Sequence, residues 1–342
     1  MPPLSEKSRT SRRSEIAFFL LTVAVSLHFA LDYVRLTNPM IGLEDYLHLQ
    51  IDTPFRYRIL PQLLYRVWAY VIAHLHIHLP SLNPPVDSPD NWFMVLLAAA
   101  SVIGAVYFTA HAIRHITGTS RYKWLSFALV LCAYFDYTLV LNRNLFYPYD
   151  LPTLFFFSAL TCFAVTGNYW LFALTFIPAE LTKETVVIAI LIFFLLQIRQ
   201  DNWKKVVSYC AFLSVLFVII KYLLFRELYQ PCAHCGNLMQ NQLRSNLSQL
   251  VNPLFWISIF SVFAYLWVAV VALWPWISQR MRYTFAITAA AWGLLMFGAG
   301  ILREIRIFSE LSALLVVVIA SGLHRRITAS GAQPGETAVS ES

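Results

Sequence analysis

The sequence predicts an all-α integral membrane protein, a polytopic helical bundle with about ten transmembrane helices. Two observations carry this prediction. Of 342 residues, 58% are hydrophobic and only 13% are charged, and the mean hydropathy is +0.61, a balance that soluble domains of this size do not show. Several apolar runs also reach about 18 residues, the length that a helix needs to cross a hydrocarbon core.

Basic residues predict how these runs are oriented across the membrane, because Lys and Arg in short loops favour the cytoplasmic side. The basic clusters are Lys7/Arg9/Arg12/Arg13, Arg114/Arg121/Lys123, Arg199/Lys204/Lys205, Arg280/Arg282 and Arg325/Arg326. Placing all of them inside predicts spans at roughly residues 16–37, 92–113, 123–141, 149–166, 168–180, 184–198, 205–227, 254–277, 283–301 and 304–322. Both termini are then inside, and we expect the bacterial cytoplasmic (inner) membrane.

Residues 15–323 are expected to form the transmembrane domain, flanked by two tails. The first apolar run follows a basic stretch but is too long for a signal-peptide core, so we expect an uncleaved anchor. Residues 1–14 and 324–342 are polar and without periodicity, which predicts disordered cytoplasmic tails.

One helical segment, RILPQLLYRVWAYVIAHLHIHL at 58–79, is expected not to cross. Apolar residues share one face of its helix: Leu60, Leu63, Leu64, Val67, Trp68, Val71, Ile72 and Leu75. This pattern is typical of a helix that lies in the membrane interface, here within an outer loop spanning 38–91. The alternative is a true span, which would turn every downstream basic cluster outward.

Ionisable residues near the expected outer surface are functional candidates, because charge within a membrane is costly. The first outer loop, NPMIGLEDYLHLQIDTPFRYR, carries Glu44, Asp45, Asp52, Arg56 and Arg58. It therefore offers carboxylates and guanidinium groups close together in the chain.

Two later outer connections add further charges. LNRNLFYPYDLP places Asp150 at an expected helix start, where it either caps the helix or serves the site. PAELTKETVV places Glu180, Lys183 and Glu184 between two short apolar runs, which indicates a broken helix pair that reaches a cavity. Pairing of Lys183 with Glu180 or Glu184 is the structural alternative.

The stretch LREIRIFSEL, residues 302–311, brings charges into the last apolar segment. On an α-helix Arg303, Arg306 and Glu310 lie within about one-sixth of a turn of each other, with Glu304 about a quarter-turn away. Two arginines on one face match the geometry of phosphate binding, whereas pairing with glutamates inside the bundle is the alternative. Carboxylates and cations from separate outer segments together indicate a site for an anionic, lipid-linked substrate.

Other patterns predict little chemistry. The Cys232–Cys235 pair in CAHC is most simply a local disulfide or two idle thiols, and the histidines of HLHIHL (His74, His76 and His78) diverge on a helix. We therefore expect no metal site of protein ligands. The basic residues are scattered between spans, so nucleic-acid binding is not indicated.

A basic-tailed first span, an acidic outer loop with interfacial helices, broken central helices and an outer cluster of cations resemble the GT-C superfamily, over roughly residues 15–323. Its members are membrane glycosyltransferases that use polyprenyl-phosphate-linked sugars. The motif PFRYRILP also resembles small bacterial membrane proteins of this type. The chain lacks the large soluble domain that many members append.

The resemblance implies a reaction at the outer (periplasmic) face. Asp45, or the adjacent Glu44, would be the catalytic base, while Arg303, Arg306 and Lys183 would hold the lipid phosphate, with inversion at the anomeric carbon. The remaining charged residues have lesser roles: Arg56 and Arg58 serve the lipid or the loop, and Asp52, Asp150, Glu180, Glu184 and Glu310 support the site.

No cofactor is required for a monophosphate donor, whereas a diphosphate donor would recruit a divalent cation through Asp52 or Asp150. The expected partners are a polyprenyl-phosphate-linked sugar, the lipid bilayer and an acceptor that is a glycan, a lipid or a protein. Two other functions stay open: a transporter or flippase of a lipid-linked or anionic solute, and a polysaccharide polymerase or ligase.

Overall fold

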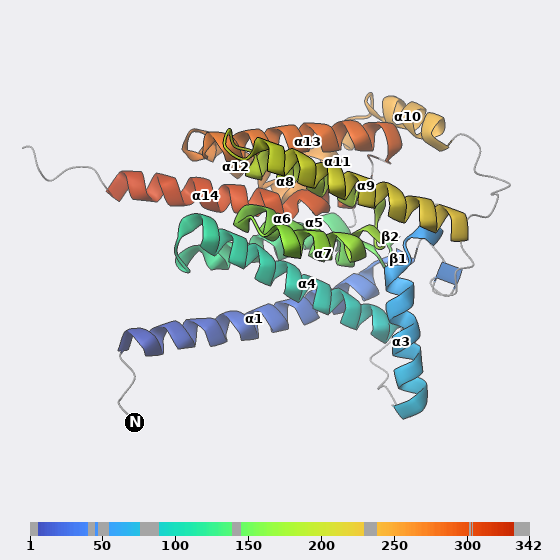
Figure 1. Cartoon of the computed structure of the whole chain (residues 1–342). Helices are drawn as coiled ribbons and strands as arrows, with labels where there is room; N and C mark the ends of the chain where they lie inside the picture. Colours follow the sequence, from blue (N-terminus) through green and yellow to red (C-terminus); the bar gives the residue numbers. More distant parts are fainter. Residues whose placement is uncertain are drawn as a thin grey trace, which may run out of the picture.

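The computed structural model describes residues 6–39, 45–46, 55–75, 89–138, 145–228, 238–300, 302 and 304–331, and these are predominantly helical (Figure 1). The α-helices are α1 Glu6–Leu36, α3 Leu60–Leu75, α4 Pro89–Thr117, α5 Ala128–Thr138, α6 Asp150–Thr166, α7 Tyr169–Glu180, α8 Val187–Gln197, α9 Trp203–Leu228, α10 Leu238–Gln249, α11 Pro253–Phe260, α12 Trp267–Leu273, α13 Gln279–Ala299 and α14 Ser312–Gly331. The 3-10 helices are η1 Phe55–Tyr57, η2 Arg121–Phe127, η4 Glu184–Val186, η5 Val262–Tyr265, η6 Trp274–Trp276 and η7 Ile305–Leu311.

The two described strands, β1 Asn38–Pro39 and β2 Leu145–Phe146, form a short parallel pair. This pair joins the end of α1 to the segment before α6.

Four helical segments are long and apolar enough to cross a membrane: Arg12–Leu36, Asp90–Thr117, Trp203–Leu228 and Ile305–Ser330. A fifth span results if the bent pair of 253–260 and 262–276, which turns by 65°, counts as one. The described chain thus has the helices of a membrane protein, but ten transmembrane helices are not confirmed.

Breaks in the helices explain the smaller number. The predicted spans at 168–180 and 184–198 correspond to α7, of 12 residues, and α8, of 11 residues. At 1.5 Å per residue each rises less than about 20 Å, which is short of a hydrocarbon core of roughly 30 Å. Hydropathy counts apolar residues, whereas a span also needs an uninterrupted helix.

The terminal helices extend beyond the predicted domain limits. Helix α1 already begins at Glu6, and α14 continues to Gly331, so both enter the segments predicted to be disordered. A helix that is established by packing elongates at little cost, because each added residue gains a hydrogen bond without a new nucleus. The start of α1 and the end of α14 lie at the same end of the bundle (Figure 1), while the side of the membrane that they face stays a prediction.

Helix α3 runs across the direction of the bundle helices, at the opposite end from the start of α1 (Figure 1). Its Tyr65 and Trp68 rings pack against Phe93 of α4, and the Tyr65 hydroxyl donates to Asp90 at 2.7 Å. Apolar side chains of α3 are also exposed, including Val67 and Leu75. The crossed direction agrees with the expectation for 58–79, whose location in the interface stays a prediction.

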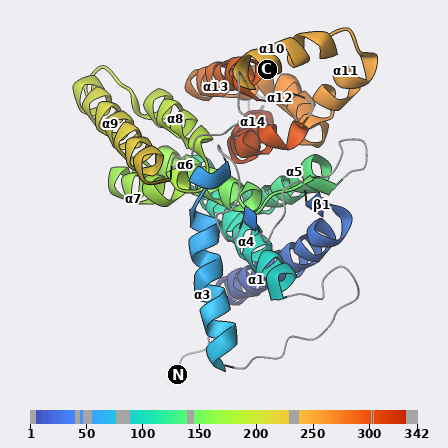
Figure 2. The same cartoon turned by 90° about the vertical axis from the view of Figure 1, so that its right-hand side faces the viewer.

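Helix α14 lies at the centre of the bundle (Figure 2). Its residues from Ala313 to Val318 are all buried, regardless of their position around the helix, which is typical of a helix surrounded on every side. Small residues permit close helix contacts: a Cβ at Gly104 of α4 would meet the Phe155 ring of α6 at 2.4 Å, and one at Gly322 would meet Ile277 at 2.9 Å. Helix α9, by contrast, is mostly exposed.

Candidate functional site

Charged residues from distant parts of the sequence meet at the end of the bundle where α3 begins. The backbone itself connects these parts: the Leu60 amide at the start of α3 donates to the Leu181 carbonyl, at 3.0 Å, in the break between α7 and α8. The residues that meet there form the main ionic cluster: Arg58, Asp150, Lys183, Glu184, Glu304, Arg306 and Glu310.

Asp150 lies between two cations at the centre of the main ionic cluster. Arg306 Nη1 donates to Asp150 Oδ2 at 2.7 Å and Arg306 Nη2 to Glu304 Oε2 at 2.5 Å. Lys183 Nζ lies 3.9 Å from Asp150 Oδ1. The side chains of Asp150, Lys183 and Arg306 are no more than 10% exposed, so water screens their charges weakly.

Glu310 holds the other side of Lys183. Its Oε1 accepts from Lys183 Nζ at 2.6 Å and its Oε2 from the Thr185 hydroxyl at 2.7 Å. Both carboxylate oxygens therefore have a donor. These two bonds fasten η7 and the start of α14 to the α7–α8 break.

Arg58 forms a two-bond pair with Glu184. Nη2 donates to Oε1 at 2.5 Å and Nε to Oε2 at 3.1 Å, the geometry of the strong guanidinium–carboxylate pair. Burial opposes the charged form of Arg58, but Glu184, Tyr149 and Asp150 together outweigh that effect and raise the pKa of Arg58 above its ordinary value. Arg58 is therefore a permanent cation that lies 9% exposed beside a partner 37% exposed.

Aromatic rings surround these cations. The Arg306 guanidinium lies 3.7 Å from the Tyr147 ring centre, and the Arg58 guanidinium lies 4.2 Å from that of Tyr149, so both make cation–π contacts. The Tyr46 hydroxyl donates to the Arg58 carbonyl at 2.6 Å. Burial raises the pKa values of Tyr46 and Tyr149 above the ordinary range, which keeps both phenols protonated.

The main ionic cluster contains three cations and four carboxylates, and each has at least one partner of opposite charge. An incoming anion therefore cannot simply join the cations. It must displace a carboxylate from a cation, or it must bind together with a proton that neutralises a carboxylate. The place between Arg306 and Lys183, now held by Asp150, is where two cations already converge on a single acceptor.

Half of the predicted site residues gather here. Arg58, Asp150, Lys183, Glu184, Arg306 and Glu310 belong to the main ionic cluster. Glu180 lies beside it and pairs with Lys221 of α9 at 2.6 Å. Arg56 lies in η1 and is partly buried, whereas Asp45 is exposed. Glu44, Asp52 and Arg303 lie outside the described residues.

Some local expectations are wrong. Asp150 is the first residue of α6 rather than its N-cap, and its carboxylate binds Arg306. Lys183 pairs with Glu310 rather than with Glu180 or Glu184. Residues 305–311 form a 3-10 helix, so the face expected for an α-helix at Arg306 and Glu310 does not apply.

Sequence reasoning missed several members of the site. Tyr46, Tyr147, Tyr149, Thr185 and Lys221 were not predicted. The YPYD stretch at the start of α6 held a usable signal, because two tyrosines directly before an acidic helix start are well placed to cover a cation.

The structure describes only part of the CAHC and HLHIHL patterns, for which no chemistry was expected. His74 is exposed on α3, and its Nδ1 lies 2.9 Å from the Tyr70 carbonyl oxygen, while Cys232, Cys235, His76 and His78 lie outside the described residues. Within the described ranges, His, Cys, Asp and Glu form no group of three or more that could hold a metal ion.

Comparisons of the chain with protein-family models, with curated proteins and with solved structures found no match.

Proposed function

We propose that the protein is a membrane glycosyltransferase that moves a sugar from a polyprenyl-phosphate-linked donor to an acceptor at the outer face. The main ionic cluster carries this proposal, because it joins cations from three separate segments at one end of the bundle. Helix α3 crosses the bundle at that same end (Figure 2). A lipid-linked phosphate would reach these cations from the headgroup region, with its chain in the bilayer.

The phosphate would bind between Arg306 and Lys183, in the place now held by Asp150. A phosphate oxygen accepts from a guanidinium and an ammonium as a carboxylate does, and more oxygens are available to it. Arg303, three residues before Arg306, would extend the same set of cations. Positive groups at this place stabilise the charge that grows on the departing phosphate.

The base would be Asp45, with Glu44 beside it. Asp45 is exposed, and the next residue, Tyr46, is anchored to the Arg58 carbonyl and packs 6.1 Å from the Tyr149 ring. This anchor keeps residue 46 beside Arg58, so the adjacent Asp45 carboxylate would lie at the edge of the main ionic cluster. A carboxylate there would take the proton of the acceptor hydroxyl as that hydroxyl attacks the anomeric carbon.

The other charged residues would hold the site together. Arg58 is committed to Glu184, so we assign it to the fold of the outer loop, and Arg56 to the lipid or the loop. Asp52 or Asp150 would bind a divalent cation only with a diphosphate donor. Asp150 is already engaged by two cations, which favours a monophosphate donor.

Single-turnover transfer of radiolabelled sugar tests this function directly. Purified protein in lipid is given a panel of polyprenyl-phosphate sugars and candidate acceptors. Asp45→Asn should lower the rate by about 10²–10⁴-fold, the range expected for loss of a general base, and it should not alter stability because Asp45 is exposed. Arg303→Ala should abolish saturable use of the donor.

Matched controls lie at the end of α9. Arg226 and Glu227 have side chains 67% and 68% exposed, so Arg226→Ala and Glu227→Gln should transfer sugar at the native rate. Absence of transfer by the native chain from every donor, together with donor binding that requires Arg303, would sink the proposal in favour of a transporter.

A transporter or flippase is the second candidate because of the bent α11–α12 pair. Phe263, Ala264 and Tyr265 have positive φ values of 59°, 53° and 61°, a left-handed turn that non-glycine residues rarely adopt. Interrupted helices of this kind line solute sites in transporters. The test is uptake of the donor into sealed vesicles without transfer of its sugar.

A further inference from the structure

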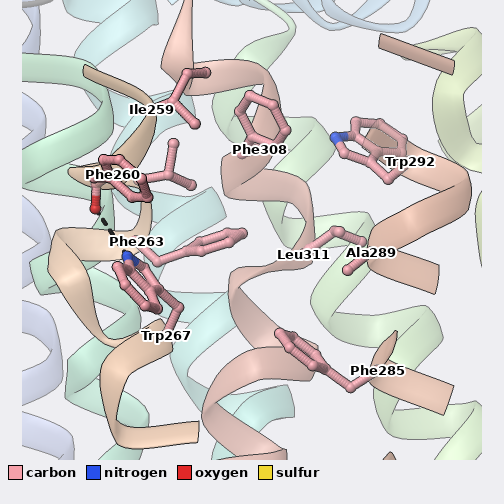
Figure 3. A pocket seen from close by; sticks show the side chains of 10 residues that line it. Ile259, Phe260, Phe263, Trp267, Phe285, Ala289, Trp292, Phe308 and Leu311 are labelled. Atoms are coloured by element: carbon pink, nitrogen blue, oxygen red, sulfur yellow. Dashed lines mark hydrogen bonds between the residues drawn. The ribbon is translucent and has the colours of Figure 1, made fainter. Parts of the chain in front are cut away.

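An apolar cavity of about 320 Å³ lies between the bent α11–α12 pair, α13 and η7 (Figure 3). Six of its lining residues are aromatic: Phe260, Phe263, Trp267, Phe285, Trp292 and Phe308. None of the described residues that line it carries a charge. It is therefore a hydrocarbon-like space.

The two tryptophans that line the cavity differ in their hydrogen bonding. Trp267 Nε1 donates to the Phe260 carbonyl at 2.8 Å, the dashed line in Figure 3. Trp292 is 0% exposed, and its Nε1 has no hydrogen-bond partner among the residues that the structure describes. Figure 3 shows this nitrogen on the side of the indole that faces Phe308 and the cavity. Buried indole N–H groups usually have a hydrogen-bond acceptor. The Trp292 N–H therefore leaves room for an acceptor supplied by an occupant of the cavity.

Water is a poor occupant of this space. A buried water needs two to four polar partners, and the indole N–H is the one buried side-chain group without a partner among the described residues that line the cavity. The helices around the cavity expose apolar side chains, among them Ile257 at 53%, Val268 at 51% and Leu294 at 75%. In a chain whose helices cross a membrane, exposed apolar side chains of this kind would face lipid, so hydrocarbon chains would lie beside the helices that enclose the cavity.

We propose that the cavity holds the upper part of an acyl chain of a bilayer phospholipid, whose ester carbonyl accepts the hydrogen bond of Trp292 Nε1. The occupant is apolar along its length and has one neutral acceptor, which are the two properties that the lining requires. This site is separate from sugar transfer and does not depend on it.

The site also touches the segment that carries the ionic residues. Phe308 and Leu311 line the cavity, while Arg306 and Glu310 of the same 3-10 helix enter the main ionic cluster. The chain of the phospholipid would therefore pack against the back of η7 and fill the space behind these charges.

Quenching of tryptophan fluorescence by brominated phospholipids tests the proposal. The full-length protein is placed in phospholipid brominated either near the ester or near the methyl end of its acyl chains. The emission of Trp292 is the difference between the native protein and the Trp292→Phe variant. This emission should be strongly quenched, and more strongly by bromine near the ester than by bromine near the methyl end. Trp170, 74% exposed on α7, is the matched control, because its emission should be quenched by ordinary contact with the bilayer. If the Trp292 emission is unquenched while that of Trp170 is quenched, the proposal is wrong.

A second variant and a competitor identify the occupant. Ala289→Leu narrows the cavity from α13 and should remove most of the quenching of Trp292 while leaving that of Trp170 unchanged. Polyprenyl phosphate without bromine should not relieve the quenching. Relief at low concentration would overturn the proposal by showing that a polyprenyl chain occupies the cavity, and it would do so independently of any transfer assay.

Discussion

The main ionic cluster and a second group of charges, the Glu15 cluster of Glu15, Arg114 and Lys123, lie at opposite ends of the bundle. In the Glu15 cluster, Glu15 accepts from Arg114 at 2.9 Å and from Lys123 at 2.7 Å. Its Glu15 and Arg114 side chains are 47% and 36% exposed, whereas its Lys123 side chain is 1% exposed. In the main ionic cluster the Lys183–Glu310 and Arg306–Asp150 pairs have side chains no more than 10% exposed.

This difference in burial separates two uses of charge. The Glu15 cluster fastens α1 to α4 and η2 through a carboxylate and a guanidinium that water reaches. The main ionic cluster removes several charges from water, and that removal costs free energy. Hydrophobic residues of similar volume at the same places would often make a protein equally stable or more stable. A bundle that needed only stability would not require these charges, so a functional role is the better explanation.

The largest expected effect on stability is at Glu310. Glu310→Gln removes the closest carboxylate from buried Lys183 and should lower the free energy of unfolding by about 3–5 kcal/mol, measured by reversible unfolding in mixed micelles. Combining Glu310→Leu with Lys183→Met removes both charges and should recover much of the loss. A loss below about 1 kcal/mol for Glu310→Gln would place this pair with ordinary surface pairs.

The next effect is expected at Asp150. Asp150→Asn removes the negative charge between Arg306 and Lys183, so sugar-free polyprenyl phosphate should bind about tenfold more tightly, equivalent to roughly 1.4 kcal/mol. Equilibrium binding by the purified protein measures this. Weaker binding than in the native chain would mean that Asp150 positions the two cations rather than occupying the anion site.

The smallest effect is expected in the Glu15 cluster. Arg114→Gln should change the free energy of unfolding by no more than about 1 kcal/mol, because exposed pairs contribute little and salt screens them. The same unfolding measurement at low and high salt checks this. A loss as large as that at Glu310 would remove the contrast between the two clusters.

Hydropathy and charge predicted the class of protein and the positions of most helices. The predicted segments at 92–113 and 205–227 match α4 and α9 because each is one long apolar run. Sorting loops by basic charge also put Asp150, Lys183 and Arg306 on one side of the membrane, and the structure brings these three residues together.

Partners and breaks were not predictable in the same way. Lys183 binds Glu310, 127 residues away, rather than Glu184 next to it, because the direction of a side chain depends on the packing of several helices. The bend between α11 and α12 contains no glycine or proline at Phe263, Ala264 or Tyr265, so no local signal marked it. The ten predicted spans are not confirmed, because α7 and α8 are too short to qualify as spans.

The most direct test is equilibrium binding of sugar-free polyprenyl phosphate to the native chain, to Arg306→Gln and to Arg114→Gln, in protein that remains folded and monodisperse. If the main ionic cluster is the phosphate site, Arg306→Gln should weaken binding by about tenfold or more, and Arg114→Gln should leave it unchanged. Equal losses in both variants, or native affinity in Arg306→Gln, would contradict the assignment of this cluster to the lipid phosphate.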